Sequence, residues 1–393
     1  MKRHHSRYVL LASCVLAVAC GDSPSEPPEP VSVSASSALP ANPAAGSTVS
    51  PAVLVQDAAG RPIAGVTVTF AVTAGGGTVS SATAVTNTSG VATVPWTLGP
   101  APGVNTLVAQ VGDLPPFTFT VTTCGAYCIE IRFVGQVTAA QELAFRNARV
   151  RWEEVISGNL PSVQMDIPAA ACKDADGNAL VNHPAVNEVV DDLLVYVQID
   201  SIDGPGKVLG SAGPCFIRST SRLPVFGIMR LDRADLTILA QNNLLNDVIL
   251  HELGHVLGFP TIWSDPMFDL LEGAGTDEPY FTGSAGANRF TLAGGTLING
   301  VGVPVENTGG EGTRDSHWRE AVLSTELMTG FISTGGNPLS AITIGSLEDI
   351  GYQVNYAAGD PYSVPPAAGV MSGWSSLRLE MIEQPMPAPR VVN

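Results

Sequence analysis

Two histidines and one glutamate lie within the five-residue stretch His251-Glu252-Leu-Gly-His255. Apolar side chains recur at helical spacing through residues 244–257, which predicts a helix with one buried face. Residues four apart share a helix face, so both imidazoles can reach one metal ion, and Zn²⁺ is commonly bound by histidine nitrogen. Glu252 lies about 100° around the helix from His251, beside the ion. The stretch therefore predicts a zinc site in which Glu252 moves a proton as general base and then general acid.

The third ligand of this site is not fixed by spacing. A catalytic zinc ion usually has three protein ligands and a water molecule. Thr261 stands where a compact HExxHxxGxxH motif would place its third histidine. Outside the first 20 residues, the only other histidines are His183 and His317, and Glu272 is the nearest downstream glutamate, the residue type that a gluzincin-like site would use. His183, Glu272 and His317 are thus the candidates that the residues themselves leave open.

A set of ordered motifs in residues 124–356 resembles the leishmanolysin family of metzincin peptidases. These motifs are residues 251–259, Gly302-Val-Pro-Val-Glu-Asn-Thr308, Ser316-His317-Trp318, Glu326-Leu-Met-Thr329 and Leu347-Glu-Asp-Ile-Gly-Tyr352. That family carries an insertion between its second and third zinc histidines, similar to the 61 residues between His255 and His317. The resemblance implies that His317 is the third ligand of one catalytic Zn²⁺, that Met328 is the Met-turn residue beneath it, and that substrates are proteins or peptides.

The first 20 residues are typical of a bacterial export signal. A basic start, residues 1–7, is followed by an apolar stretch that is too short to span a bilayer. Residues 16–20 resemble a lipobox, which implies that Cys20 is acylated and becomes the first residue of the mature protein. The Ser/Pro-rich residues 21–34 are expected to form a tether. We expect the protein in the bacterial cell envelope, lipid-anchored at the outer membrane or cell surface, or else secreted.

Residues 35–123 have the pattern of an all-β domain. Short runs alternate between apolar and polar residues, as in residues 66–72 and 117–121, and turn signals such as Gly75-Gly-Gly77 separate them. The segment resembles bacterial Ig-like domains of the invasin type, which implies a β-sandwich. It contains no histidine and almost no carboxylate. We therefore expect a spacer or a module that contacts a surface partner.

Residues 124–356 alternate between strand and helix patterns, which predicts a mixed α/β (α+β) domain of the metzincin type. Strands are expected at 129–133, 192–199 and 225–231, with the last at a sheet edge where an extended substrate could pair. Thr138 and Gln141 fit a capping box that opens a helix to about Ile156. Residues 357–393 are Pro-rich and are expected to form a C-terminal tail.

Cysteines and charge restrict the remaining possibilities. Because export favours disulfide formation, Cys124, Cys128, Cys172 and Cys215 are expected to form disulfides, and proximity favours Cys124–Cys128 with Cys172–Cys215. The chain of 393 residues has 19 Lys and Arg against 36 Asp and Glu, a formal net charge of −17. With so few basic residues, the chain has no run of Lys and Arg that could form a basic surface, which argues against nucleic acid as a partner.

These observations favour an exported zinc-dependent endopeptidase with an Ig-like domain before its catalytic domain. One alternative is a surface adhesin whose peptidase-like domain only binds. Another is a zinc hydrolase that acts on a non-peptide bond. The presence of Glu252 argues against the adhesin, because binding alone does not need that carboxylate.

Overall fold

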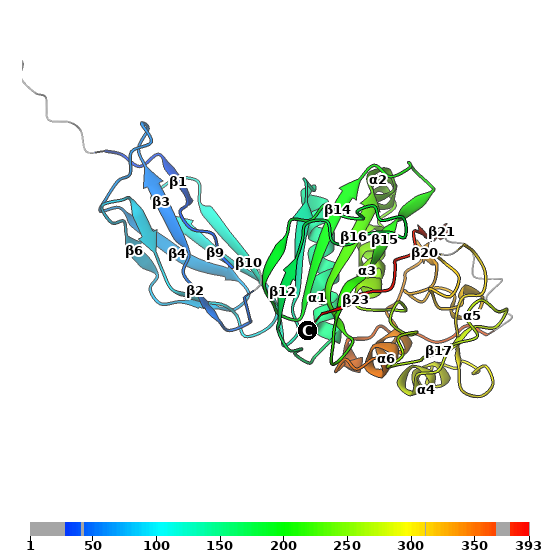
Figure 1. Cartoon of the computed structure of the whole chain (residues 1–393). Coiled ribbons are helices and arrows are strands. Elements are labelled where there is room, and N and C mark those ends of the chain that lie inside the picture. Colours follow the sequence, from blue (N-terminus) through cyan, green and yellow to red (C-terminus); the bar gives the residue numbers. More distant parts are fainter. Residues whose placement is uncertain (1–27, 41–42, 311, 367–377, 393) are drawn as a thin grey trace, which may run out of the picture.

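The chain folds into two successive regions, shown in Figure 1 as a computed structural model. The structure describes residues 28–40, 43–310, 312–366 and 378–392. The predicted export signal with Cys20, and residues 21–27 of the predicted tether, lie outside the described residues. Residues up to 123 (blue to cyan) are rich in strands, and the following residues (green to red) combine strands and helices.

The N-terminal region contains only strands among its described elements. These are β1 (Ser32–Ala35), β2 (Thr48–Val49), β3 (Ala52–Gln56), β4 (Thr67–Ala74), β5 (Thr78–Val79), β6 (Thr83–Val85), β7 (Val91–Thr93), β8 (Trp96–Thr97), β9 (Gly103–Gln110) and β10 (Phe117–Thr123). Their sheets have the orders β1-β3-β7, β10-β9-β4-β6 and β2-β8-β5. In β4, Val68 and Phe70 are buried and alternate with exposed residues, the pattern that places one face on a core. The prediction of an all-β region is confirmed.

The second region begins with β11 and contains all the described helices. Its elements are β11 (Ile129–Val134), α1 (Ala139–Val155), β12 (Val163–Ile167), β13 (Val186–Val190), β14 (Leu193–Asp200), β15 (Val208–Arg218), β16 (Pro224–Asp232), α2 (Arg233–Gln241), α3 (Leu245–Val256), β17 (Leu271–Glu272), β18 (Tyr280–Phe281), α4 (Ser284–Leu292), β19 (Val303–Pro304), α5 (Glu320–Leu323), β20 (Phe331–Ser333), α6 (Ala341–Asp349), the 3₁₀ helix η1 (Tyr356–Ala358), β21 (Arg378–Glu380), β22 (Ile382–Glu383) and β23 (Arg390–Val392). The prediction of a mixed α/β region is confirmed.

The central sheet of this region has the order β11-β14-β16-β15-β22. Strands β11, β14 and β16 are parallel, and β15 is antiparallel to β16. The expectation that residues 225–231 form an edge strand is wrong, because β16 is hydrogen-bonded on both sides. The prediction rested on a short apolar run. A central strand that is buried on both faces shows the same pattern, so the run does not distinguish the two positions.

Helices α1 and α3 cover one face of the sheet. Helix α1 begins with the predicted capping box: the Gln141 amide donates to the Thr138 hydroxyl, and the Thr138 amide donates to Gln141 Oε1. Val248, Leu253 and other apolar residues of α3 are fully buried in the core that α1 shares. Trp152 of α1 donates from its indole nitrogen to a carbonyl of α3, at 2.8 Å. Figure 1 shows both helices behind the strands.

The other face of the sheet is covered by the β12–β13 hairpin and by a disulfide-linked loop. Cys172 is bonded to Cys215 of β15, and Cys124 is bonded to Cys128 before β11. Both pairings agree with the prediction from proximity. The first of these disulfides closes a loop between residues 43 apart in the sequence, which restricts the unfolded chain.

Residues after 377 return to the sheet. Strand β21 pairs with β20, and both β22 and β23 pair with β15. Figure 1 shows β23 (red) lying beside β15, with β21 near β20. The stretch expected to be a tail therefore contributes strands to the second region. Among the described residues, no helix is both long and apolar enough to cross a membrane.

Candidate metal centre

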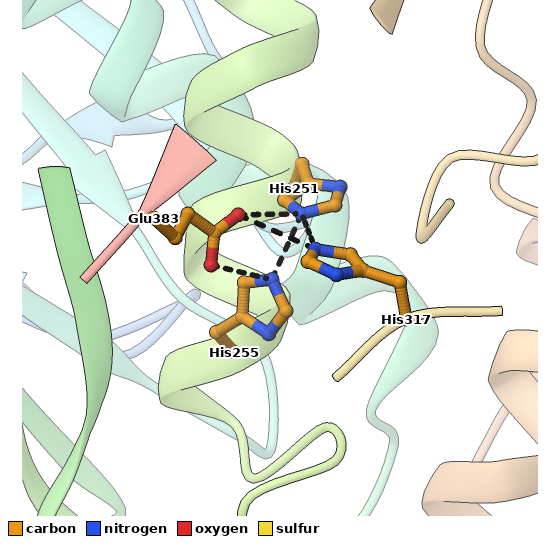
Figure 2. Close-up of side chains that lie close together, drawn as sticks. All are labelled: His251, His255, His317 and Glu383. Atoms are coloured by element: carbon orange, nitrogen blue, oxygen red, sulfur yellow. Dashed lines mark hydrogen bonds and ion pairs between the residues drawn. The ribbon is translucent and has the colours of Figure 1, made fainter. Parts of the chain in front are cut away.

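Helix α3 places His251 and His255 on one buried face. They are 0% and 3% exposed, and their imidazole Nε2 atoms lie 2.8 Å apart. The third histidine reaches the same point from another segment, since His317 Nε2 lies 3.2 Å from His251 Nε2. The fold therefore brings together His251, His255 and His317, the three histidines that the family resemblance implies as ligands (Figure 2).

The other ring nitrogen of each histidine faces a backbone carbonyl. His251 Nδ1 lies 2.6 Å from the Leu327 carbonyl, His255 Nδ1 lies 2.6 Å from that of Phe259, and His317 Nδ1 lies 3.2 Å from that of Thr313. A carbonyl only accepts, so each Nδ1 carries a proton, which leaves Nε2 as the atom of each ring that can bind a metal ion. Burial also lowers the pKa of His251 to about 4, which favours its neutral form.

Three converging lone pairs repel one another unless a cation lies between them. Four ligands placed tetrahedrally at 2.0–2.1 Å from Zn²⁺ are separated by about 3.3 Å. The Nε2 separation of 3.2 Å agrees with that value, and the separation of 2.8 Å is shorter. The donor set therefore fits a zinc ion, with each Nδ1 hydrogen bond orienting its ring as the outer partners of metal-bound histidines do.

His317 is positioned by a loop that a buried glutamate organises. Glu306 accepts hydrogen bonds from the backbone amides of Asn307, Thr308 and Glu320. The Glu306 amide itself donates to the His317 carbonyl at 2.8 Å. This carboxylate thus fixes both ends of the segment that carries the third histidine.

Residues 326–329 form a turn that contacts both the helix α3 and the segment that carries His317. The Leu327 carbonyl accepts from His251, and the Met328 carbonyl accepts from the Trp318 amide, next to His317. Met328 is fully buried, and a Cβ added at Gly254 of α3 would lie 2.8 Å from its sulfur. Gly254 therefore allows the turn and the helix to approach closely, so the Met328 side chain packs against the helix that carries His251 and His255.

Glu326 holds this turn in place. Its carboxylate accepts from the Met328 amide at 2.7 Å, from the amide and hydroxyl of Ser340 at 3.1 and 2.7 Å, and from the Thr343 hydroxyl at 2.6 Å. The Thr343 hydroxyl in turn accepts from the Trp318 indole at 2.8 Å. A continuous network of hydrogen bonds therefore links the neighbour of His317 to the turn and to the start of α6.

Replacing Glu326 with alanine is expected to destabilise the metal-free protein by more than about 3 kcal/mol, because several buried donors lose their acceptor at about 1–3 kcal/mol each. Glu326→Gln keeps one acceptor oxygen, although its NH2 group faces a donor that the carboxylate accepted from. We therefore expect a smaller loss of stability than in the alanine variant. Urea unfolding of both variants and the parent measures this. Equal stability of parent and alanine variant would contradict the role of the network.

Glu252 is completely buried beside the three histidines. Neither of its carboxylate oxygens accepts a hydrogen bond from the described residues. Burial, reinforced by the negative charge of Glu383, raises the pKa of Glu252 well above its usual value. A buried carboxylate without partners is costly, and such a group beside a metal centre is characteristic of a functional residue.

Glu383 is a fourth member of the centre, and the sequence did not predict it. Its carboxylate oxygens lie 3.4 Å from Nε2 of His251, 3.4 Å from that of His255 and 3.3 Å from that of His317 (Figure 2). Burial opposes its charged form, but the adjacent histidines His255 and His317 outweigh burial and hold the pKa of Glu383 well below its usual range. No local spacing signals this residue, which lies 66 positions after His317 beyond a Pro-rich stretch.

The two other candidates for the third ligand lie elsewhere. His183 is buried on the opposite face of the sheet, where its Nε2 accepts from the Ala171 amide at 2.9 Å and its ring packs against Tyr196 and Phe226. Glu272 is an exposed residue of β17. The structure brings neither to the cluster of His251, His255, His317 and Glu383.

A helix with two histidines and a glutamate, completed by a distant histidine over a methionine turn, is typical of metal-dependent peptidases. The chain belongs to the leishmanolysin family of zinc metalloproteases, peptidase family M8, whose model matches residues 140–363, more than half of the chain. The Crithidia fasciculata leishmanolysin homolog is 28% identical over 183 residues, which cover 42% of this chain and 25% of that protein. Leishmania donovani leishmanolysin is 24% identical over 229 residues, which cover 56% and 35%.

The chain thus spans about a third or less of the length of these relatives. The D00–D0 domain of intimin is one solved structure to which part of this chain is similar. That similarity has 22% sequence identity and a TM-score of 0.21, and it covers 24% of this chain and 46% of the intimin chain.

Proposed function

We propose that this protein is an exported zinc-dependent endopeptidase that hydrolyses peptide bonds in protein or peptide substrates. The observation that carries the proposal is the convergence of three imidazole lone pairs beside an unpartnered buried glutamate, Glu252. Membership of a metalloprotease family supports it. His251, His255 and His317 would hold one zinc ion.

The chemistry divides between the ion and the protein. When bound, zinc supplies a Lewis acid that polarises the scissile carbonyl and makes a water molecule acidic near neutral pH. Glu252 would accept a proton from the attacking water at a carboxylate oxygen and return it to the leaving nitrogen. The Nδ1 hydrogen bonds of the histidines keep their Nε2 atoms unprotonated and correctly aimed.

An aromatic cluster keeps this geometry rigid. Phe259, Trp263, Phe281 and Trp318 pack with ring centroids 4.3–5.6 Å apart, and all four are fully buried. Phe259 supplies the carbonyl that orients His255, and Trp318 follows His317. Rings that are locked by packing support a metal centre better than flexible side chains would.

Metal removal tests the proposal. Purified protein of residues 21–393 is expected to contain one zinc ion and to cleave a quenched-peptide library at a measurable rate. A zinc chelator should abolish cleavage, and added zinc should restore it. A non-peptide ester panel run in parallel separates peptidase from other hydrolase activity. Cleavage that persists in metal-free protein would refute the proposal, as would esterase activity without any peptide cleavage.

We further propose that the chain is anchored by lipid at Cys20 in a bacterial envelope and that its N-terminal region is an invasin-type Ig-like spacer. The lipobox-like residues 16–20 and the strand-rich fold of residues 32–123 support this. The chelator-sensitive activity of the full chain is then expected in the membrane fraction of expressing bacteria. A Cys20→Ala change should release it, and identical fractionation of both proteins would count against the anchor.

A further inference from the structure

Within the C-terminal segment, residues 378–392, residues 382–392 follow β15 from one end to the other. Ile382 and Glu383 are in register with Val208 and Gly210, and residues 390–392 are in register with 216–218. The Gln384 amide donates to the Gly210 carbonyl at 2.8 Å, and the Ser219 amide donates to that of Val392 at 2.9 Å. The segment therefore takes the sheet edge nearest α3, where an extended substrate would otherwise add.

The segment is built into its position rather than resting on the surface. Met381 is 2% exposed within the core that α1 and α3 share, and its amide donates to the Gly330 carbonyl. The Arg390 guanidinium lies 4.2 Å from the Phe216 ring centroid and donates to the Ala171 carbonyl. At Gly312, an added Cβ would lie 1.9 Å from the Glu383 carbonyl oxygen, so that loop closes over the segment.

Proline pre-organises the part between the two paired ends. Pro385, Pro387 and Pro389 alternate with other residues, and each favours an extended chain at itself and at the residue before it. An already extended segment loses less conformational entropy when it lies on an edge strand. Because proline lacks an amide proton, the alternation also limits further pairing on the outer side.

A substrate would place its scissile carbonyl at the metal centre, whereas this segment places a side chain there. Glu383 has 7% of its side chain exposed; its Oε1 lies 3.4 Å from His251 Nε2 and 3.3 Å from His317 Nε2, and its Oε2 lies 3.4 Å from His255 Nε2. These separations match the edge of about 3.3 Å expected between ligands of a tetrahedral zinc ion. A carboxylate at this fourth position occupies the place that the reacting water needs.

We propose that residues 378–392 are an autoinhibitory strand that covers the substrate edge while Glu383 serves as the fourth zinc ligand. The inference rests on the proposed function and adds its regulation. A tethered segment acts at an effective concentration of about millimolar, so it competes strongly with free peptides. The intact chain therefore cleaves peptides at a low basal rate, which rises when this strand leaves β15.

Point variants of the tail test this in the otherwise intact chain. Glu383→Ala should raise kcat/KM for a quenched peptide at least about tenfold over the parent. Glu380→Ala is the matched control, because Glu380 is exposed in β21 of the same segment and should leave the rate within about twofold. With Co²⁺ in place of zinc, Glu383→Ala should also change the visible absorption spectrum, and Glu380→Ala should not. An unchanged spectrum and rate in Glu383→Ala would overturn the inference.

A second measurement supplies the strand in trans. Protein ending at residue 366 should cleave faster than the full chain, and a synthetic peptide of residues 378–392 should inhibit it competitively. The same peptide with alanine at position 383 should inhibit at least about tenfold more weakly, and equal inhibition by both would overturn the role of Glu383. If the shortened protein fails to fold, the point variants still decide.

The outcomes also separate this inference from the proposed function. A cobalt spectrum that responds to Glu383→Ala, with no cleavage by any variant, supports the carboxylate ligand and refutes the peptidase. Equal cleavage by parent, Glu383→Ala and shortened protein supports the peptidase and refutes the autoinhibitory strand.

Discussion

Replacing Glu252 with glutamine lowers peptide hydrolysis by about 10²–10⁴-fold, the range typical of a positioned general acid–base, while the protein stays folded and binds one zinc ion. An amide has nearly the shape of the carboxyl group but cannot accept and return the proton. Neither oxygen of Glu252 has a hydrogen-bond partner among the described residues, so the change breaks no contact there. Steady-state kinetics, zinc content and thermal unfolding of parent and variant measure the three effects.

Glu153→Gln is the matched control, because Glu153 is also a buried helical glutamate. Unlike Glu252, it has partners: it accepts from the Ile129 amide at 2.8 Å and lies 3.2 Å from the Arg149 guanidinium. Removing one charge of a buried pair is destabilising, so this variant should unfold more easily yet keep its activity when folded. Glu252→Gln with more than a tenth of parental activity would contradict the proposed role.

The same variant distinguishes catalysis from adhesion. A surface adhesin would show no turnover in the parent, and Glu252→Gln would leave its binding unchanged. An endopeptidase loses turnover and retains whatever the N-terminal region binds.

The local parts of the centre were predictable because short-range rules govern them. The helix spacing of residues 244–257 predicts α3, and four-residue separation alone places His251 and His255 on one face. The capping box at Thr138 predicts the start of α1 for the same reason, since both partners lie within one turn. The disulfide pairings followed from proximity along the chain.

Long-range features were harder to predict from one sequence. Spacing left His183, Glu272 and His317 open as third ligand, and only the resemblance to a family favoured His317. The physical reason is visible in the fold: the loop that carries His317 is held by Glu306 and by residues of the turn at 326–329, all distant from α3 in sequence. No periodicity encodes such contacts.

The strand order and the place of Glu383 could not be predicted from the sequence, for a related reason. An apolar run such as residues 225–231 does not reveal how many neighbours the strand has, and β16 proved central rather than at the edge. Glu383 is one acidic residue in a Pro-rich stretch that resembles a linker. Only the pairing of β22 with β15 shows that its side chain points at the histidines.

Removing His317 tests the long-range part of the centre and has the second large expected effect. Changes in the outer partners of metal ligands typically reduce metal affinity or activity 10–100-fold, so loss of a ligand itself should weaken zinc binding by more than about 100-fold. His317→Ala should therefore lose zinc during dialysis against a weak chelator and lose peptide hydrolysis with it. Competition with a chromogenic chelator gives the change in affinity.

His183 and Glu272, the other two candidates for the third ligand, provide controls. Neither variant is expected to lose zinc, in contrast to His317→Ala. His183→Ala leaves the buried Ala171 amide without its acceptor and removes a ring that packs on Tyr196 and Phe226, so it should lower the stability of metal-free protein by about 1–3 kcal/mol or more and leave zinc affinity intact. Glu272→Ala, at an exposed position, should change neither property. Zinc loss in either control, with retention in His317→Ala, would show that the ion is bound elsewhere and that the convergence of the three Nε2 atoms has another cause.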